Sequence, residues 1–292
     1  MERIPESELI LNEDGSIYHL HLKPGDIADT IILVGDPERV AEVSQHFDSI
    51  EVAKQNREFK THTGYLNNQR LSVIATGIGT DNIDIVFNEL DALVNVDFAL
   101  RQVKSDLTAL SFFRLGTSGA IQSEINVDSL LISEAAIGFG NLLHFYQSDA
   151  IREASFERAL ADHLQWNNAS SQPYIVSCDE GLLNRFTEGE FIQGCTVTNV
   201  GFYGPQSRKI RLPLGDPDLS DKLRDFSYQH HQITNLEMET AGIYGMAKLL
   251  GHRAVSLNAI LANRATGEFS AQPAATVQRL IKESLAIITN LS

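Results

Sequence analysis

The sequence predicts an α/β fold of three layers, in which helices cover both faces of a mixed central sheet. Short apolar runs, each followed by a glycine-containing turn, alternate with segments whose apolar residues recur at helical spacing. This alternation favours a mixed or parallel sheet covered by helices. No linker rich in proline, glycine and serine divides the chain, so we predict a single domain over residues 1–292.

Six segments are predicted to be strands. Thr30–Val34 precedes Gly-Asp-Pro, Arg70–Thr76 precedes Gly-Ile-Gly, and Ser111–Leu115 precedes Gly-Thr-Ser-Gly. Such short apolar runs are typical of strands that are buried on both faces of a sheet. The other three candidates are Ser129–Ser133, Cys195–Val200 and Ala254–Leu261.

Three segments are predicted to be helices: Asn82–Val94, Glu239–Leu250 and Ala274–Leu291. Gly251 follows the second of them, where glycine commonly ends a helix. Two polar segments, residues 95–109 and 204–232, are predicted to be surface excursions from the domain.

Composition excludes several classes of partner. Lys and Arg total 23 against 38 Asp and Glu, a net charge of −15, which argues against binding to nucleic acid or to an anionic membrane. Cys178 and Cys195 form neither a metal-ligand spacing nor a disulfide framework. The polar N-terminal segment has no apolar core of a signal peptide, and no apolar run is long enough to span a bilayer. We therefore expect a cytoplasmic protein.

Arginines accompany the glycine turns and indicate an anion site. Ligands of α/β sheets bind beyond the carboxyl ends of strands, where glycine lets the backbone approach an anion. Arg39 follows the turn at Gly35, and Arg114 lies inside an apolar strand. A buried Arg114 would either pair with a carboxylate or reach such a site, and its planar fork of donors suits phosphate. Arg57, taken alone, is typical of an exposed arginine.

Three further segments are candidates for binding roles. Thr234 and Glu237 match a helix capping box, which is sufficient to explain Glu237, whereas Glu239 could accept hydrogen bonds from sugar hydroxyls. The polar turn Gly204–Arg208 is either a solvated loop or a reader of the edge of a base. Asn263-Arg264 follows a buried strand and should lie at its carboxyl end.

The nine histidines show no metal-binding motif, so we predict no metal site. His230-His231 is interpreted as a surface pair, and a structural role is the simpler interpretation of His19.

Taken together, these motifs resemble the nucleoside phosphorylase family, over nearly the whole chain. The matching segments are His19-Leu20, Gly35–Val40, Asn56–Phe59, Thr76–Gly79, Phe113–Gln122, Phe202–Arg208, Glu237–Glu239 and Asn263–Thr266.

The resemblance implies a role for each residue. The implied phosphate site consists of Gly35, Arg39, Arg114 and Thr117, with Arg57 from a neighbouring subunit. The implied ribose site consists of Met238 and Glu239, with His19 of the neighbour. The implied base site consists of Ser118, Gly119, Phe202, Gln206 and Arg208, with Arg264 behind it. Arg114, Gln206 and Arg208 would be the catalytic residues.

The implied reaction is phosphorolysis of uridine, and of deoxyuridine or thymidine if the site tolerates them, to free base and ribose 1-phosphate. Purine-specific relatives carry an Asp where this chain has Asn263, and an amide cannot act as a general acid. The alternatives are a purine or broad-specificity phosphorylase, a nucleosidase, and a nucleoside-binding protein without catalysis. Sites shared between subunits imply at least a dimer, and bacterial members are typically hexamers.

No cofactor is expected beyond phosphate as a co-substrate. Relatives bind a monovalent cation near the matches of Glu58 and Ile78, but this chain replaces a serine of that site, which argues against potassium.

Overall fold

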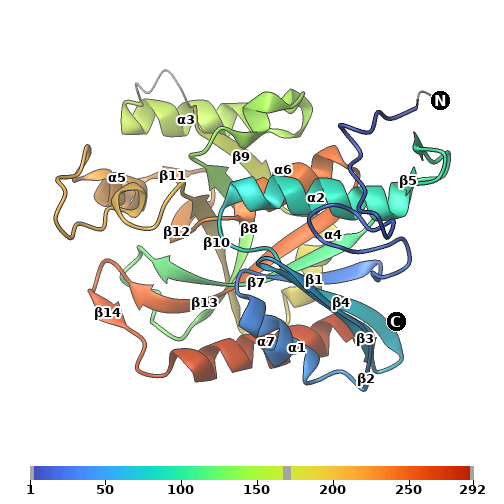
Figure 1. Cartoon of the computed structure of the whole chain (residues 1–292). Coiled ribbons are helices and arrows are strands. Elements are labelled where there is room, and N and C mark those ends of the chain that lie inside the picture. The colour runs from blue at the N-terminus through green and yellow to red at the C-terminus, as the bar shows by residue number, and fades with distance from the viewer. Residues whose placement is uncertain (1–2, 167–171, 290–292) are drawn as a thin grey trace.

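The computed structural model describes residues 3–166 and 172–289, and it has the predicted arrangement of helices on both faces of a large mixed sheet. Helices α1 and α7 lie on one side of the sheet, and α2, α3 and α6 lie on the other (Figure 1). The helices are α1 (Pro37–Ser44), α2 (Thr80–Asn95), α3 (Ala154–Leu164), α4 (Glu180–Leu183), α5 (Leu219–Asp225), α6 (Thr240–Leu249) and α7 (Pro273–Thr289).

The large sheet has the strand order β11-β12-β10-β8-β13-β7-β1-β4-β3-β2, with β9 paired to β8 and β14 paired to β13. Its strands are β1 (Thr30–Val34), β2 (Ser49–Asn56), β3 (Phe59–Leu66), β4 (Gln69–Ala75), β7 (Ser111–Ala120), β8 (Leu130–Gly138), β9 (Tyr174–Ser177), β10 (Phe191–Thr198), β11 (Ser227–Tyr228), β12 (His231–Glu237), β13 (Arg253–Asn263) and β14 (Glu268–Phe269).

The central strands run parallel and then reverse. Strands β4, β1, β7 and β13 are parallel neighbours, β8 is antiparallel to β13, and β10 and β12 continue parallel to β8. Strand β12 also pairs with the end of β7, through Leu236 opposite Gly119. The pairings β7-β13-β8-β10-β12-β7 therefore close a ring, which brings the carboxyl end of β12 beside the carboxyl end of β7.

The predicted helices are confirmed to within two residues at each end that the structure describes, whereas three strands end elsewhere. Strand β8 continues past Ser133 to Gly138. Strand β7 continues through Gly116–Gly119 to Ala120 instead of ending at Leu115, because these residues keep pairing with β13. Strand β10 spans Phe191–Thr198, so Asn199 and Val200 lie beyond it.

Several strands were not predicted from the sequence, and among them is β9, although its residues Tyr174–Val176 are apolar. Strands β2 and β3 form a polar hairpin at the sheet edge, β9 has four residues, and β12 was taken in part for the start of a helix. The predicted capping box at Thr234 is wrong, because Thr234 lies within β12 and its hydroxyl donates to the carbonyl of Cys195.

Both predicted excursions have structure of their own. Residues 95–109 contain a small hairpin of β5 (Val96–Asp97) and β6 (Gln102–Val103), and the side chain of Arg101 donates to the carbonyls of Ile4 and Pro5. Residues 204–232 contain a short 3-10 turn, α5 and β11, and they lead into β12.

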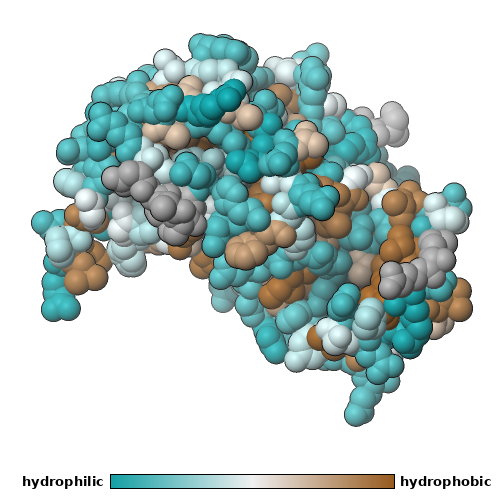
Figure 2. Space-filling model, turned by 90° about the horizontal axis from the view of Figure 1, so that it is seen from above, coloured by the Kyte–Doolittle hydropathy of each residue, from teal (hydrophilic) through white to brown (hydrophobic). Residues whose placement is uncertain are grey.

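No helix among the described residues is long and apolar enough to cross a membrane. The face above α2 and α3 is mostly hydrophilic, and its apolar residues occur in separate groups (Figure 2).

Candidate active site

A cavity of about 780 Å³ opens where the carboxyl ends of β1, β4, β7, β12 and β13 meet. It contains most of the residues that the sequence predicted for a site. Those lining it are Gly35, Arg39, Arg114, Thr117, Ser118, Gly119, Phe202, Gln206, Arg208, Met238 and Glu239. Glu58 and Ile78, the residues considered for a monovalent cation, line it as well.

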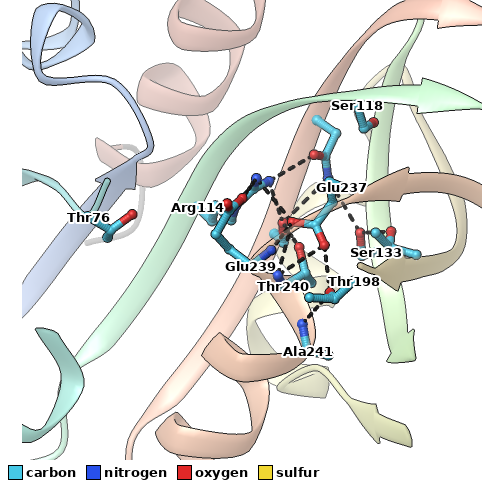
Figure 3. A network of polar contacts seen from close by, with 12 residues as sticks. Thr76, Arg114, Ser118, Ser133, Thr198, Glu237, Glu239, Thr240 and Ala241 are labelled. Carbon is cyan, nitrogen blue, oxygen red and sulfur yellow. Dashed lines mark hydrogen bonds and ion pairs between the residues drawn. The ribbon is translucent and has the colours of Figure 1, made fainter. Parts of the chain in front are cut away.

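Arg114 is the central cation of this cavity, and it is buried at 6% exposure. Its Nη2 lies 2.6 Å from Glu239 Oε2 and 3.0 Å from Glu237 Oε2, and its Nη1 donates to Asn258 at 2.9 Å (Figure 3). The two interpretations offered for Arg114 are therefore compatible: it forms a buried ion pair and it also lines the cavity.

Gly116 allows this arrangement. The Arg114 side chain folds back over Gly116, two residues along the same face of β7, and a Cβ at Gly116 would collide with the guanidinium. Gly116 is thus required by the path of the Arg114 side chain.

Glu237 does more than the capping role predicted for it. Its carboxylate accepts hydrogen bonds from the backbone N–H groups of Glu239 and Thr240, at 2.9 and 3.0 Å, and from the hydroxyl of Thr198 at 2.6 Å. Together with Arg114, these donors saturate a carboxylate that is 4% exposed. The spacing of Glu237 and Glu239 could have indicated this pairing. The two carboxylates lie two residues apart, and both bind the same buried arginine, Arg114.

The charges of this network are unbalanced. Burial acts to lower the pKa of Arg114, but Glu237 and Glu239 outweigh it, so the pKa of Arg114 is raised. Burial raises the pKa of Glu239, Glu237 adds to that effect, and Arg114 opposes it without reversing it. Because two carboxylates share one guanidinium, an additional hydrogen-bond donor would stabilise the charged form of Glu239.

A second arginine stands beside the first. Arg39 lies in the first turn of α1, and its Nη1 donates to the carbonyl of Leu115 at 3.4 Å. Burial lowers the pKa of Arg39, and the positive charge of Arg114 acts in the same direction. The start of α1 is fixed by Asp36, whose side chain accepts from the N–H of Glu38. Arg39 at the start of α1 and the neighbouring Arg114 of β7 make this end of the cavity suited to an anion.

Gln206 and Arg208 form the other polar group of the cavity. Arg208 Nη1 donates to Gln206 Oε1 at 2.5 Å and to the carbonyl of Phe202 at 2.8 Å, and its guanidinium stacks 3.8 Å from the centroid of the Phe202 ring. Burial, followed by the charge of Arg264, lowers the pKa of Arg208 to about 10. Arg264 supports this turn from behind by donating to the carbonyls of Gln206 and Ser207.

Strand β7 sets the order of these groups. Arg114 folds over Gly116, whereas a Cβ on Gly119 would lie 3.8 Å from Arg208. The anion end and the Gln206–Arg208 end are therefore separated along one strand, and Glu239 lies beside Arg114.

Three predicted residues are not among the described residues that line the cavity: His19, Arg57 and Arg264. His19 Nδ1 lies 2.6 Å from Glu89 Oε1, and Arg57 is exposed in the turn between β2 and β3. For His19 and Arg57, the family resemblance had implied contributions to a neighbouring subunit's site.

Asn263 does not face the cavity. It is buried, its Nδ2 donates to the carbonyls of Gln122 and Ile125, and its Oδ1 accepts from the N–H groups of Ala265 and Thr266. These four bonds use the whole amide, so Asn263 holds the turn that carries Arg264.

The chain is similar to known proteins of one superfamily. A sequence model of the phosphorylase superfamily matches residues 29–291. A uridine phosphorylase of Thermococcus kodakarensis is 32% identical over 273 residues, covering 92% of this chain and 85% of that protein. A DeoD-type purine nucleoside phosphorylase of Oceanobacillus iheyensis is 27% identical over 253 residues, covering 86% of this chain and 88% of that protein.

Among solved structures, a Trypanosoma brucei nucleoside phosphorylase described as showing uridine phosphorylase activity superposes with a TM-score of 0.88. The two chains are 26% identical, and the match covers 97% of this chain and 100% of the other.

The network around Glu237 predicts a loss of stability in Glu237→Gln. The new amide nitrogen would face N–H donors, so we expect the free energy of unfolding to fall by about 1–3 kcal/mol. Urea unfolding followed by circular dichroism measures this, with Glu283→Gln, an exposed position on α7, as the matched control. Equal stability of the two variants would contradict the network.

Proposed function

Because the chain belongs to the phosphorylase superfamily, we propose that it cleaves uridine with inorganic phosphate, giving uracil and ribose 1-phosphate. The observation that carries this proposal is the order of groups within one cavity. Buried arginines lie at one end, a glutamine–arginine pair lies at the other, and Glu239 lies next to the anion end.

Phosphate is proposed to bind between Arg39 and Arg114, with the Gly35 backbone and the Thr117 hydroxyl as further donors. Phosphate is a mixture of monoanion and dianion near neutral pH, and planar guanidinium groups bind its oxygens in pairs. The −15 net charge of the chain makes this local concentration of arginine all the more necessary.

The ribose is proposed to lie over Met238 and Glu239. A carboxylate with a raised pKa that shares Arg114 with Glu237 gains from the O–H groups of a sugar. This contact would fix the anomeric carbon relative to the phosphate, and such positioning contributes a large part of catalysis in two-substrate reactions.

Gln206 and Arg208 are proposed to bind the edge of uracil, near Ser118, Gly119 and Phe202. The amide offers both a donor and an acceptor, and the guanidinium stabilises negative charge on the departing base. A phosphate oxygen then bonds to the anomeric carbon, the carbon–nitrogen bond breaks, its electron pair stays on the base, and the base takes a proton from solvent. No covalent enzyme intermediate and no cofactor is required.

Arg57 and His19 are proposed to act in a neighbouring subunit, so the working protein would be at least a dimer. Their positions support this, because neither lines its own cavity among the described residues. Two free buried cysteines fit a reducing compartment, and we propose a cytoplasmic location.

The reaction class is tested by a panel of uridine, thymidine and inosine, each with and without phosphate, followed by absorbance. We expect phosphate-dependent cleavage of uridine and little cleavage of inosine, because Gln206 and Arg208 are suited to a uracil edge. Thymidine, which lacks the 2′-hydroxyl and carries a 5-methyl group, reports whether the site tolerates these two changes together. Cleavage without phosphate would indicate a nucleosidase, faster cleavage of inosine a purine phosphorylase, and no cleavage a binding protein.

Shared sites predict complementation between two damaged subunits. Arg39→Ala removes a cavity arginine, and Arg57→Ala removes the residue proposed to reach the neighbour. Each variant alone should lose most activity. Random mixing of equal amounts should make about half of the dimers mixed, each with one intact site, so about a quarter of wild-type activity should return.

The mixture is made by co-expression, and its activity is compared with that of the two separately expressed variants. A mixture no more active than its components would contradict a site shared between subunits.

A further inference from the structure

A second group of chemically active side chains lies outside the cavity, in Glu134 of β8, Cys195 of β10 and His231 at the start of β12. Glu134 Oε1 is 2.9 Å from His231 Nδ1 and 3.8 Å from Cys195 Sγ. The ligand atoms of the three side chains all lie within 4.8 Å of one another. The sequence suggested no such group, because the three residues are far apart along the chain and His231 was taken for a surface histidine.

The sheet is irregular where this group forms. The pairing of β10 shifts between Gly194 and Cys195 on the β8 side, and between Cys195 and Thr196 on the β12 side. Such shifts redirect side chains and are common beside functional sites. Cys195 lies at both shifts, and Glu134 lies opposite the first of them, between the partners of Gly194 and Cys195.

The three side chains are oriented and partly accessible. Cys195 is fully buried, whereas the side chains of Glu134 and His231 are 17% and 20% exposed. The His231 ring stacks on Phe156 at 5.3 Å with an interplanar angle of 17°, which fixes its plane while Nδ1 faces Glu134. An ion could therefore enter past the carboxylate and the imidazole and reach the sulfur beneath them.

We propose that Glu134, Cys195 and His231 bind a zinc ion, with water as the fourth ligand. Thiolate, imidazole and carboxylate are the protein ligands of Zn²⁺, and bonds of 2.0–2.3 Å in a tetrahedron place ligand atoms roughly 3.3–3.8 Å apart. The two distances of this group, 2.9 and 3.8 Å, lie close to that range. The sulfur ligand favours zinc over the harder ions magnesium and calcium.

The ion would tie three strands together at the opposite end of β12 from the candidate active site, about 20 Å away at the usual rise of a strand. Strand β12 begins at His231 and ends at Glu237, which binds Arg114, and residues 204–232 lead directly into β12. None of the three ligands lines the cavity. The site would therefore stabilise the fold, because a metal that binds only the folded state raises its stability.

Cobalt(II) is the probe for this site, because a thiolate bound to Co²⁺ gives a charge-transfer absorption in the near ultraviolet. The full-length protein is treated with a chelator, freed of it, and titrated with Co²⁺ and then with Zn²⁺. We expect the band to reach its maximum at one Co²⁺ per chain and to disappear as Zn²⁺ replaces it. We also expect Zn²⁺ to raise the midpoint of thermal unfolding.

Four variants separate the site from other metal-binding groups. Cys195→Ser should abolish the band, and His231→Gln should weaken Co²⁺ binding at least tenfold. Cys178→Ser, which removes the other thiol, and His144→Gln, which removes a histidine bonded to the carbonyl of Gln172, should leave both unchanged.

Absence of the band in wild-type protein would overturn the proposal, and so would its persistence in Cys195→Ser. If Cys195→Ser does not fold, the wild-type titration and His231→Gln decide the question. The expected loss of Co²⁺ affinity in His231→Gln supports the site, and unchanged affinity contradicts it.

Discussion

A guanidinium buried inside a sheet is the constraint on which this structure depends. Arg114 could not remain there uncompensated, because the cost of burying an unpaired charge is far larger than the net stability of a domain. Glu237 and Glu239 supply the compensation from the end of β12 and the start of α6, and Asn258 supplies an acceptor from β13. The ring of strand pairings is what brings these elements to the same point.

The same ion pair explains how a protein of net charge −15 can present a site for anions. The carboxylates allow Arg114 to be buried, and burial keeps the arginine in one geometry and away from water, where its interaction with a ligand is stronger. Arg39 adds a second cation at the start of α1, and Glu239 retains capacity for hydrogen-bond donors. The proposed phosphate and ribose sites are therefore adjacent because they share Arg114.

Sequence patterns predicted the strands that form continuous apolar runs and missed strands rich in polar residues, even where, as in β12, most of the residues are buried. Strands β1, β4 and β13 were apparent as apolar runs, whereas the polar hairpin β2–β3 and the strand β12 were not. The roles of single residues were mispredicted for a related reason, because these roles depend on contacts with residues distant in the sequence. Glu237 was explained by its local cap, His231 by its exposed neighbour His230, and Asn263 by its position at a strand end. The structure instead shows Glu237 paired with Arg114 and Asn263 turned away from the cavity.

The central claim is that Arg114, although paired internally, binds phosphate. Isothermal titration of inorganic phosphate into wild-type protein and Arg114→Ala tests it most directly, with circular dichroism to confirm that the variant is folded. The account predicts measurable binding to wild-type protein and at least a tenfold weaker affinity in the variant. Equal affinity of the two proteins for phosphate would contradict it and would leave Arg114 as a structural ion pair alone.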